Sequence, residues 1–307
     1  MLQALIQAFT KDADYASIAA GISSGMKEQL ISGLSGSSRQ VLMAALAADT
    51  GRPLMVMTHN MFAAQKIADD LQEALSPDQV LLYPANELVA AEAAISSPET
   101  LSQRIDVLIR CAQGFRGIVV VPFSGVRRLL PIPETWREAR VELKEGETIQ
   151  LEAFLLHMVE MGYQRVERVE SRGEMSVRGG IVDFYPMTTR WGYRVELFDD
   201  EIDSIRMFDP QDQRSVEKVQ EVTVTPCKEV IASHQRMDQA ADAAALLLEE
   251  QLDKMTDRQA KQHLKEEIHR EIELLREHVY FDEIYKYISL LYPERKTLAD
   301  YMPEDTI

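Results

Sequence analysis

Over its first 125 residues the sequence alternates short apolar runs with segments of helical spacing, and this alternation constrains the fold more than any other feature. The apolar runs have the length and β-rich composition of buried strands. The segments between them carry apolar side chains three and four positions apart, as amphipathic helices do. Strands separated by helices are typical of an α/β layer with a parallel sheet, which we predict for residues 1–126. The runs span residues 53–59, 79–84 and 117–122, and the helical segments span 61–74 and 100–111.

The pattern changes after Pro122. Residues 177–186 and 193–209 form two β-rich runs with a turn-rich loop between them, which favours hairpin-like pairing. This pattern does not continue the strand–helix alternation of the first domain. We therefore predict an inserted α+β domain over residues 127–222.

The last third of the chain has a helical composition. Residues 237–279 are nearly free of glycine and proline, and an apolar stripe at helical spacing runs from Leu264 to Val279. We predict either one long helix or a helical hairpin, packed on the first domain, within a mainly helical segment at residues 223–307. A free coiled-coil dimer is disfavoured because the apolar repeat breaks near Gln259.

Charge and composition narrow the classes of partner. The 307 residues carry a net charge of −17, so the chain as a whole repels phosphate and is a poor candidate for non-specific DNA binding. No apolar run approaches the length of a membrane span, and the N-terminus has no secretory leader. With only two isolated cysteines, Cys111 and Cys227, the sequence fits a reducing compartment. We expect a cytoplasmic protein with protein partners and no membrane contact.

The sequence offers no catalytic or metal-binding constellation. The histidines are scattered, without the spacing of a zinc site, and the two cysteines do not cluster with them. The acids Asp199, Asp200 and Glu201 fit a turn between strands better than a catalytic pair, which needs carboxyl groups converging across a cleft. We predict no catalytic residue and no metal site.

A glycine-containing loop before a helix occupies the place of a phosphate-binding loop. The working motif needs a final glycine, a lysine and a hydroxyl residue, which give the phosphates backbone N–H groups and a charge and give Mg²⁺ a ligand. Gly33 and Gly36 fit this motif, but Ser38, Arg39 and Gln40 stand at those three positions. A guanidinium does not replace the lysine, and an amide offers no hydroxyl to a metal. We interpret the loop as a nucleotide site that has decayed, and we expect no ATPase activity.

Five stretches together carry a resemblance to a known family. They are GLSGSSRQ, YPANELVAAEAAISSPETLSQRIDVL, VVVPFSGVRRLLP, GYQRVERVESRGEMSVRGGIVDFYPM and YRVELFDDEIDSIRMFDP. The chain resembles the N-terminal region of the transcription-repair coupling factors, which is similar in fold to the first domains of the excision-repair protein UvrB. The resemblance implies a parallel-sheet, helicase-like domain with an inserted α+β domain and a helical closing segment, corresponding to UvrB domains 1a, 2 and 1b. The chain differs from UvrB in the decayed loop and in residues 82–94, which contain a single tyrosine where UvrB has the aromatic-rich segment of a DNA-clamping hairpin.

The resemblance implies an adaptor that recruits the repair protein UvrA. It implies that ATP and Mg²⁺ serve only motor domains elsewhere in a longer protein, whose C-terminal part masks the UvrA-binding surface by an autoinhibitory contact. RNA polymerase and DNA would be bound only through such other domains. Two alternatives stay open: an ATP-dependent DNA helicase or translocase domain, and a polymerase-binding structural module.

The insert contains the residues suited to recognition. Between Met161 and Phe198 lie six arginines and five acids, so this window is near +1 within an acidic chain. Arginine pairs with carboxylates at two points and is enriched in interface hot spots. Arg194 and Glu196 are two apart in a predicted strand and project from one face. The alternative is a solvated face of locally paired charges. By resemblance to the UvrA-binding surface of UvrB, the candidates are Arg165, Arg178, Arg194 and Glu196, with Phe184 as an apolar anchor.

Overall fold

The computed structural model describes residues 2–85 and 97–307. These residues form two compact units, which are described separately below. The first combines the described part of Met1–Ala91 with Val107–Arg128 and Lys296–Ile307. The second combines the described part of Glu92–Asp106 with Leu129–Arg295. The division into three domains at residues 126 and 222 stays a prediction.

The first unit contains a three-stranded parallel sheet in the order β1-β3-β2. The central strand β3 is buried at all five positions, and Ile118 is in register with both Leu54 of β1 and Val80 of β2. Helix α4 packs on the sheet through Ala64, Ala68 and Leu71. The predicted parallel α/β layer is therefore confirmed. The strands are β1 (Leu54–Thr58), β2 (Val80–Leu82) and β3 (Ile118–Pro122).

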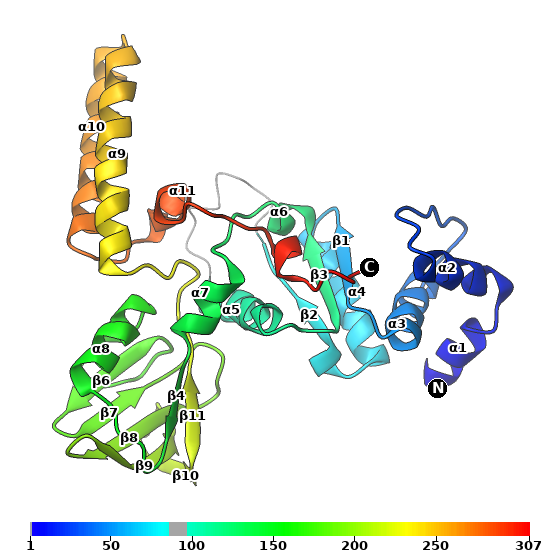
Figure 1. Cartoon of the computed structure of the whole chain (residues 1–307), viewed down its shortest axis with the longest axis horizontal. Coiled ribbons are helices and arrows are strands. Elements are labelled where there is room, and N and C mark those ends of the chain that lie inside the picture. The colour runs from blue at the N-terminus through cyan, green and yellow to red at the C-terminus, as the bar shows by residue number, and fades with distance from the viewer. Residues whose placement is uncertain (1, 86–96) are drawn as a thin grey trace. The chain divides into compact units, whose positions relative to one another are not determined.

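Helix α4 lies between the sheet and α3, and α1 and α2 pack on α3, as can be followed in Figure 1. The side chain of Asn60 accepts a hydrogen bond from the N–H of Ala63 and so caps α4 at its start. The helices are α1 (Leu2–Phe9), α2 (Ala13–Ser23), α3 (Ser38–Thr50), α4 (Met61–Ala74), η1 (Pro77–Gln79), α6 (Phe123–Val126) and η4 (Leu298–Tyr301); α5 (Pro98–Ala112) is divided between the two units.

The second unit contains a six-stranded sheet in the order β10-β9-β8-β7-β6-β5. All neighbours are antiparallel except β5 and β6. Asp199 and Asp200 form the two-residue turn between β8 and β9, and Asp199 has a φ of 59°, so the turn expected at these acids is confirmed. The strands are β5 (Gln164–Arg165), β6 (Glu174–Arg178), β7 (Ile181–Phe184), β8 (Gly192–Phe198), β9 (Glu201–Phe208) and β10 (Ser215–Val219).

The second unit also contains a helical hairpin, α9 (His234–Lys254) followed by α10 (Arg258–Arg276). The two helices run side by side in Figure 1 and bury Ala244, Leu248 and Leu275 in a common core. Asp257 caps α10 by accepting from the N–H groups of Gln259 and Ala260. Of the two forms predicted, the hairpin is the one observed, and the break in the apolar repeat falls at the start of α10. Packing of these helices on the first domain stays a prediction.

Smaller elements complete the second unit. They are α7 (Pro133–Ala139), β4 (Val141–Lys144), α8 (Leu151–Glu160), β11 (Glu221–Val224), η3 (Asp282–Tyr287) and α11 (Ile288–Leu291). Strands β4 and β11 pair antiparallel in a separate two-stranded sheet. Within the described residues no helix is long and apolar enough to cross a membrane.

Candidate partner-binding face

The register of the six-stranded sheet collects polar side chains on one of its faces. Asp183 of β7 is in register with Arg194 of β8, which in turn is in register with Arg206 of β9. Residues directly opposite one another in neighbouring strands project to the same side. We call the resulting surface the polar face. It comprises Ser176, Arg178, Ile181, Asp183, Arg194, Glu196, Ser204 and Arg206.

The opposite rows of the sheet form its core. Val182, Val195 and Ile205 lie in register there and have no exposed surface. Phe184 belongs to these rows and is itself fully buried. Its ring stacks on that of Tyr193 at 5.7 Å between ring centres. The role of apolar surface anchor suggested for Phe184 is therefore wrong for this structure, because its side chain packs inside the sheet.

Asp183 is the centre of the polar face. The residue is only 1% exposed, and its carboxylate accepts hydrogen bonds from Nε of Arg194 at 2.7 Å and from Nη2 of Arg194 at 2.8 Å. Nη2 of Arg178 also lies 2.8 Å from Asp183 Oδ2. The hydrogen bond to Asp183 raises the pKa of Arg194, whose guanidinium also lies 5.1 Å from the ring centre of Phe208. The structure thus joins two of the candidate arginines through a buried acid.

The two arginines differ in how far they reach solvent. The side chain of Arg178 is 55% exposed, whereas that of Arg194 is 19% exposed. Glu196 lies on the same face and accepts a hydrogen bond from the hydroxyl of Ser204 at 2.8 Å. The fold therefore brings Arg178, Arg194 and Glu196 onto one surface, with each charged group oriented by a partner.

Arg165 lies elsewhere. It is on the two-residue edge strand β5 and is exposed. Its register partner is Met175, which belongs to the buried rows of the sheet. The structure does not place Arg165 in the register rows of the polar face.

Five residues of this face were not among the candidates: Ser176, Ile181, Asp183, Ser204 and Arg206. The sequence analysis counted Asp183 only among the five acids between Met161 and Phe198. In the structure it is buried and joins Arg178 to Arg194. The sequence signal for such a residue is an aspartate that alternates with apolar residues in a predicted strand. The sequence does not reveal which arginines face it, because that depends on the strand register.

The glycine loop lies where the sequence analysis expected it, directly before α3. Gly33 and Gly36 have positive φ values of 83° and 55°, which glycine adopts readily. The hydroxyl of Ser38 donates to the carbonyl of Ser35 at 2.6 Å, and the amide of Gln40 donates to Asp70 of α4 at 2.9 Å. Arg39 is exposed. The residue at the hydroxyl position is thus held by the neighbouring helix.

The stretch at residues 82–94 that was expected to lack a DNA-clamping hairpin lies mostly outside the described residues, so this expectation stays a prediction. Over the part of the chain that the structure describes, there is no cluster of three or more His, Cys, Asp or Glu side chains suited to a metal ion.

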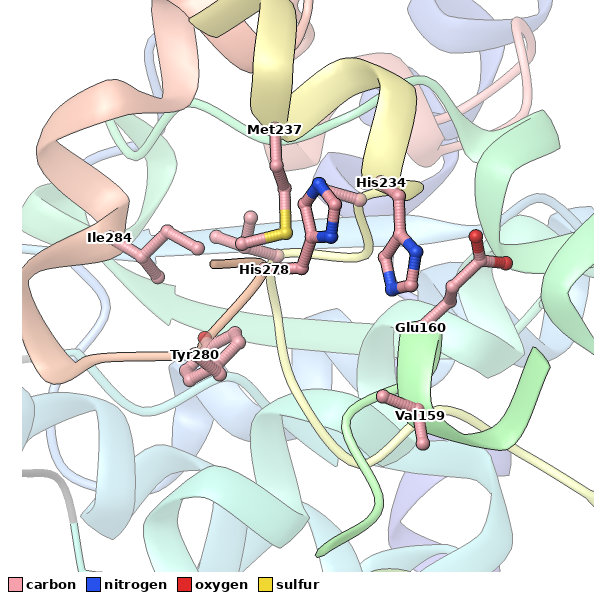
Figure 2. Close-up of a pocket in the computed structure, with 9 residues that line it drawn as sticks. Val159, Glu160, His234, Met237, His278, Tyr280 and Ile284 are labelled. Carbon is pink, nitrogen blue, oxygen red and sulfur yellow. The ribbon is translucent and has the colours of Figure 1, made fainter. Parts of the chain in front are cut away.

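Two histidines that looked scattered in the sequence meet in the second unit. Figure 2 shows His234 and His278 beside Glu160 and Met237 at a small pocket. The two imidazole rings stack with centres 4.0 Å apart, and Nε2 of His278 lies 2.9 Å from Asp238 Oδ1. The cavity volume is about 20 Å³, which suits a single water molecule and not a nucleotide. The stacked pair joins the start of α9 to the segment that follows α10.

Comparison with known proteins identifies the sheet that carries the polar face. Residues 141–229, from β4 to the segment after β11, match the family of the UvrB interaction domain. The second unit is therefore built around a UvrB interaction domain.

The similarity extends over nearly the whole chain. It is 41% identical to the transcription-repair-coupling factor of Bacillus subtilis (strain 168) over 303 residues, which are 98% of this chain and 26% of that protein. The same protein from Staphylococcus aureus strains MRSA252 and NCTC 8325 is 33% identical over 285 residues, 92% of this chain and 24% of each relative. The chain belongs to the transcription-repair-coupling factor family and corresponds to its amino-terminal part. It spans about a quarter of the length of these relatives.

Proposed function

We propose that this chain is the adaptor part of a transcription-repair coupling factor and that it recruits the repair protein UvrA through the polar face. The observation that carries the proposal is the Arg178–Asp183–Arg194 cluster, which lies within the UvrB interaction domain. Side chains already held in position lose less conformational freedom when a partner binds. A surface of ordered arginines with Glu196 beside them is suited to a partner that carries both acidic and basic groups.

In this proposal the chain does not hydrolyse ATP. Arg39 and Gln40 replace the lysine and hydroxyl that a phosphate loop uses, and Gln40 is hydrogen-bonded to Asp70. ATP and Mg²⁺ would serve motor domains in another part of a longer, cytoplasmic protein, and RNA polymerase and DNA would bind there as well. The C-terminal part of that protein would cover the polar face until UvrA is needed.

The test is a calorimetric titration of purified UvrA against the wild-type chain and against Arg178→Ala. Arg178 is chosen because its exposed side chain can be removed with little effect on folding. We expect micromolar or tighter binding that weakens about tenfold in the variant, equivalent to about 1.4 kcal/mol.

The matched control is Arg214→Ala. Arg214 is 86% exposed and pairs only loosely with Asp212 at 3.7 Å, in the turn before β10 and outside the polar face. The Arg214→Ala variant should bind UvrA as the wild type does. Absence of binding by the wild-type chain, or equal weakening in both variants, would contradict the proposal.

A further inference from the structure

Arg206 occupies an electrostatically unfavourable position on the polar face. It is in register with Arg194 on β8 and with Lys218 on β10, so three cations stand side by side across neighbouring strands. Like charges directly opposite one another in a sheet destabilise the pairing. A position that the fold alone would not favour calls for an explanation in function.

The other cations of this row are balanced. Nε of Arg194 lies 2.7 Å from Asp183 Oδ1, and Nζ of Lys218 lies 2.9 Å from Glu145 Oε1. Arg206 differs from them: among the residues that the structure describes it has no ion-pair partner. Its Nε is also buried without a hydrogen bond, which is an unfavourable state for a charged donor.

The remaining geometry suits an incoming carboxylate. The backbone of Arg206 is fixed within β9, which has a strand on each side, and its side chain is half-buried. Adjacent to it, Arg194 is partly exposed and fixed by Asp183. A carboxylate placed over this pair would accept hydrogen bonds from a planar guanidinium and relieve the repulsion between the two arginines.

We infer that Arg206 is a further contact residue of the polar face and that it receives an acidic side chain of the recruited protein. This inference rests on the proposed function and specifies the chemistry of its partner, a protein carboxylate. A nucleic-acid phosphate would offer a similar anion, but the net charge of −17 opposes binding of a polyanion.

The experiment compares Arg206→Met with the wild type in two measurements: calorimetric affinity for UvrA and the thermal midpoint of the free chain. Methionine retains most of the aliphatic stem and removes the charge. We expect affinity to fall about tenfold, because a desolvated charge contact is lost, while the thermal midpoint stays the same or rises. Lys218→Met is the matched control: it removes a neighbouring cation that is already paired, and it should bind UvrA as the wild type does.

The outcomes separate this inference from the proposed function. If the wild-type chain binds UvrA and Arg206→Met binds equally well, the inference is overturned and the proposed function stands. If Arg206→Met binds weakly but melts at a lower temperature, Arg206 has a structural role and the inference is again overturned. If the wild-type chain does not bind UvrA but binds a labelled DNA duplex through Arg206, both are overturned.

Discussion

Arg194 and Asp183 meet at two points across β7 and β8, with Nε 2.7 Å from Oδ1 and Nη2 2.8 Å from Oδ2. The same arginine that is a candidate for partner binding therefore also compensates a buried charge. Arg178 reaches the same carboxylate from a far more exposed position. The two candidate arginines should consequently differ in what their removal does to the fold.

Arg194→Ala should destabilise the chain by about 3 kcal/mol, because removing one partner of a buried pair leaves the other uncompensated. Arg178→Ala should cost less than about 1 kcal/mol, as is usual for a solvent-exposed pair. Urea unfolding followed by circular dichroism measures both, through a shift in midpoint at constant slope. Equal losses in the two variants would show that Asp183 does not depend chiefly on Arg194.

A second buried acid lies in α10 of the helical hairpin. Glu271 of α10 has no exposed surface; it accepts a hydrogen bond from the hydroxyl of Tyr287 at 2.6 Å and one from Nζ of Lys286 at 3.0 Å. Tyr287→Phe leaves one carboxylate oxygen without this donor and should cost about 1–3 kcal/mol. Urea unfolding at neutral pH gives the value. Tyr193→Phe is the control, since Tyr193 is only partly buried and lies in β8 of the six-stranded sheet; an equal loss there would contradict the prediction.

The same cluster predicts how stability changes at alkaline pH. Burial and the hydrogen bond to Glu271 raise the pKa of Tyr287. Burial opposes the charged form of Lys286, but hydrogen bonds to Glu271 and Glu267 outweigh it and raise that pKa too. Both groups keep protons in the folded chain that the unfolded chain releases above about pH 10. Their contribution is therefore complete below about pH 10 and is lost as pH rises further.

Unfolding free energies measured from pH 8 to 11 test this expectation. The wild type should lose stability above pH 10 more steeply than Tyr287→Phe, which lacks one of the two groups. Parallel profiles for the two proteins would show that Tyr287 does not contribute to the decline.

The sequence predicted the parallel layer, and a long helix or helical hairpin in the last third, because both depend on local apolar periodicity. It could not predict the neighbours of Arg194. Counting outward from the two-residue turn at Asp199 and Asp200 would pair Arg194 with Ile205. An irregularity in register between Glu196 and Leu197 moves the pairing by one residue, to Arg206. A bulge of this kind depends on packing and has no reliable sequence signal, so Arg206 was missed.

The remaining candidate residues differ in whether the structure buries their side chains. Phe184 and Arg178 both follow the alternation of β-strands, and the sequence alone does not say which face is covered. The stacking of Phe184 on Tyr193 shows that its row is the core. Arg165 was selected by resemblance, and the two residues of β5 are too few for periodicity to assign a face.

The two cysteines should be unreactive in the folded chain. Burial raises the pKa of the Cys227 thiol to about 12, and Cys111 is buried as well. Since the thiolate is the reactive form, iodoacetamide at pH 8 should label neither residue in native buffer and both in urea. Mass spectrometry of the two samples measures this. Native labelling of Cys227 would contradict its described burial.

The glycine loop yields the last prediction, which separates an adaptor from an ATP-dependent enzyme. A nucleotide present at a hundred times its dissociation constant would stabilise the folded chain by about 2.7 kcal/mol. Because Gln40 is hydrogen-bonded to Asp70 and Arg39 replaces the loop lysine, we expect millimolar Mg-ATP to leave the thermal midpoint unchanged. Arg39→Ala should behave in the same way. A rise in the midpoint of the wild type that is absent from Arg39→Ala would show that the loop still binds phosphate, and would favour the enzyme alternative for this part of the chain.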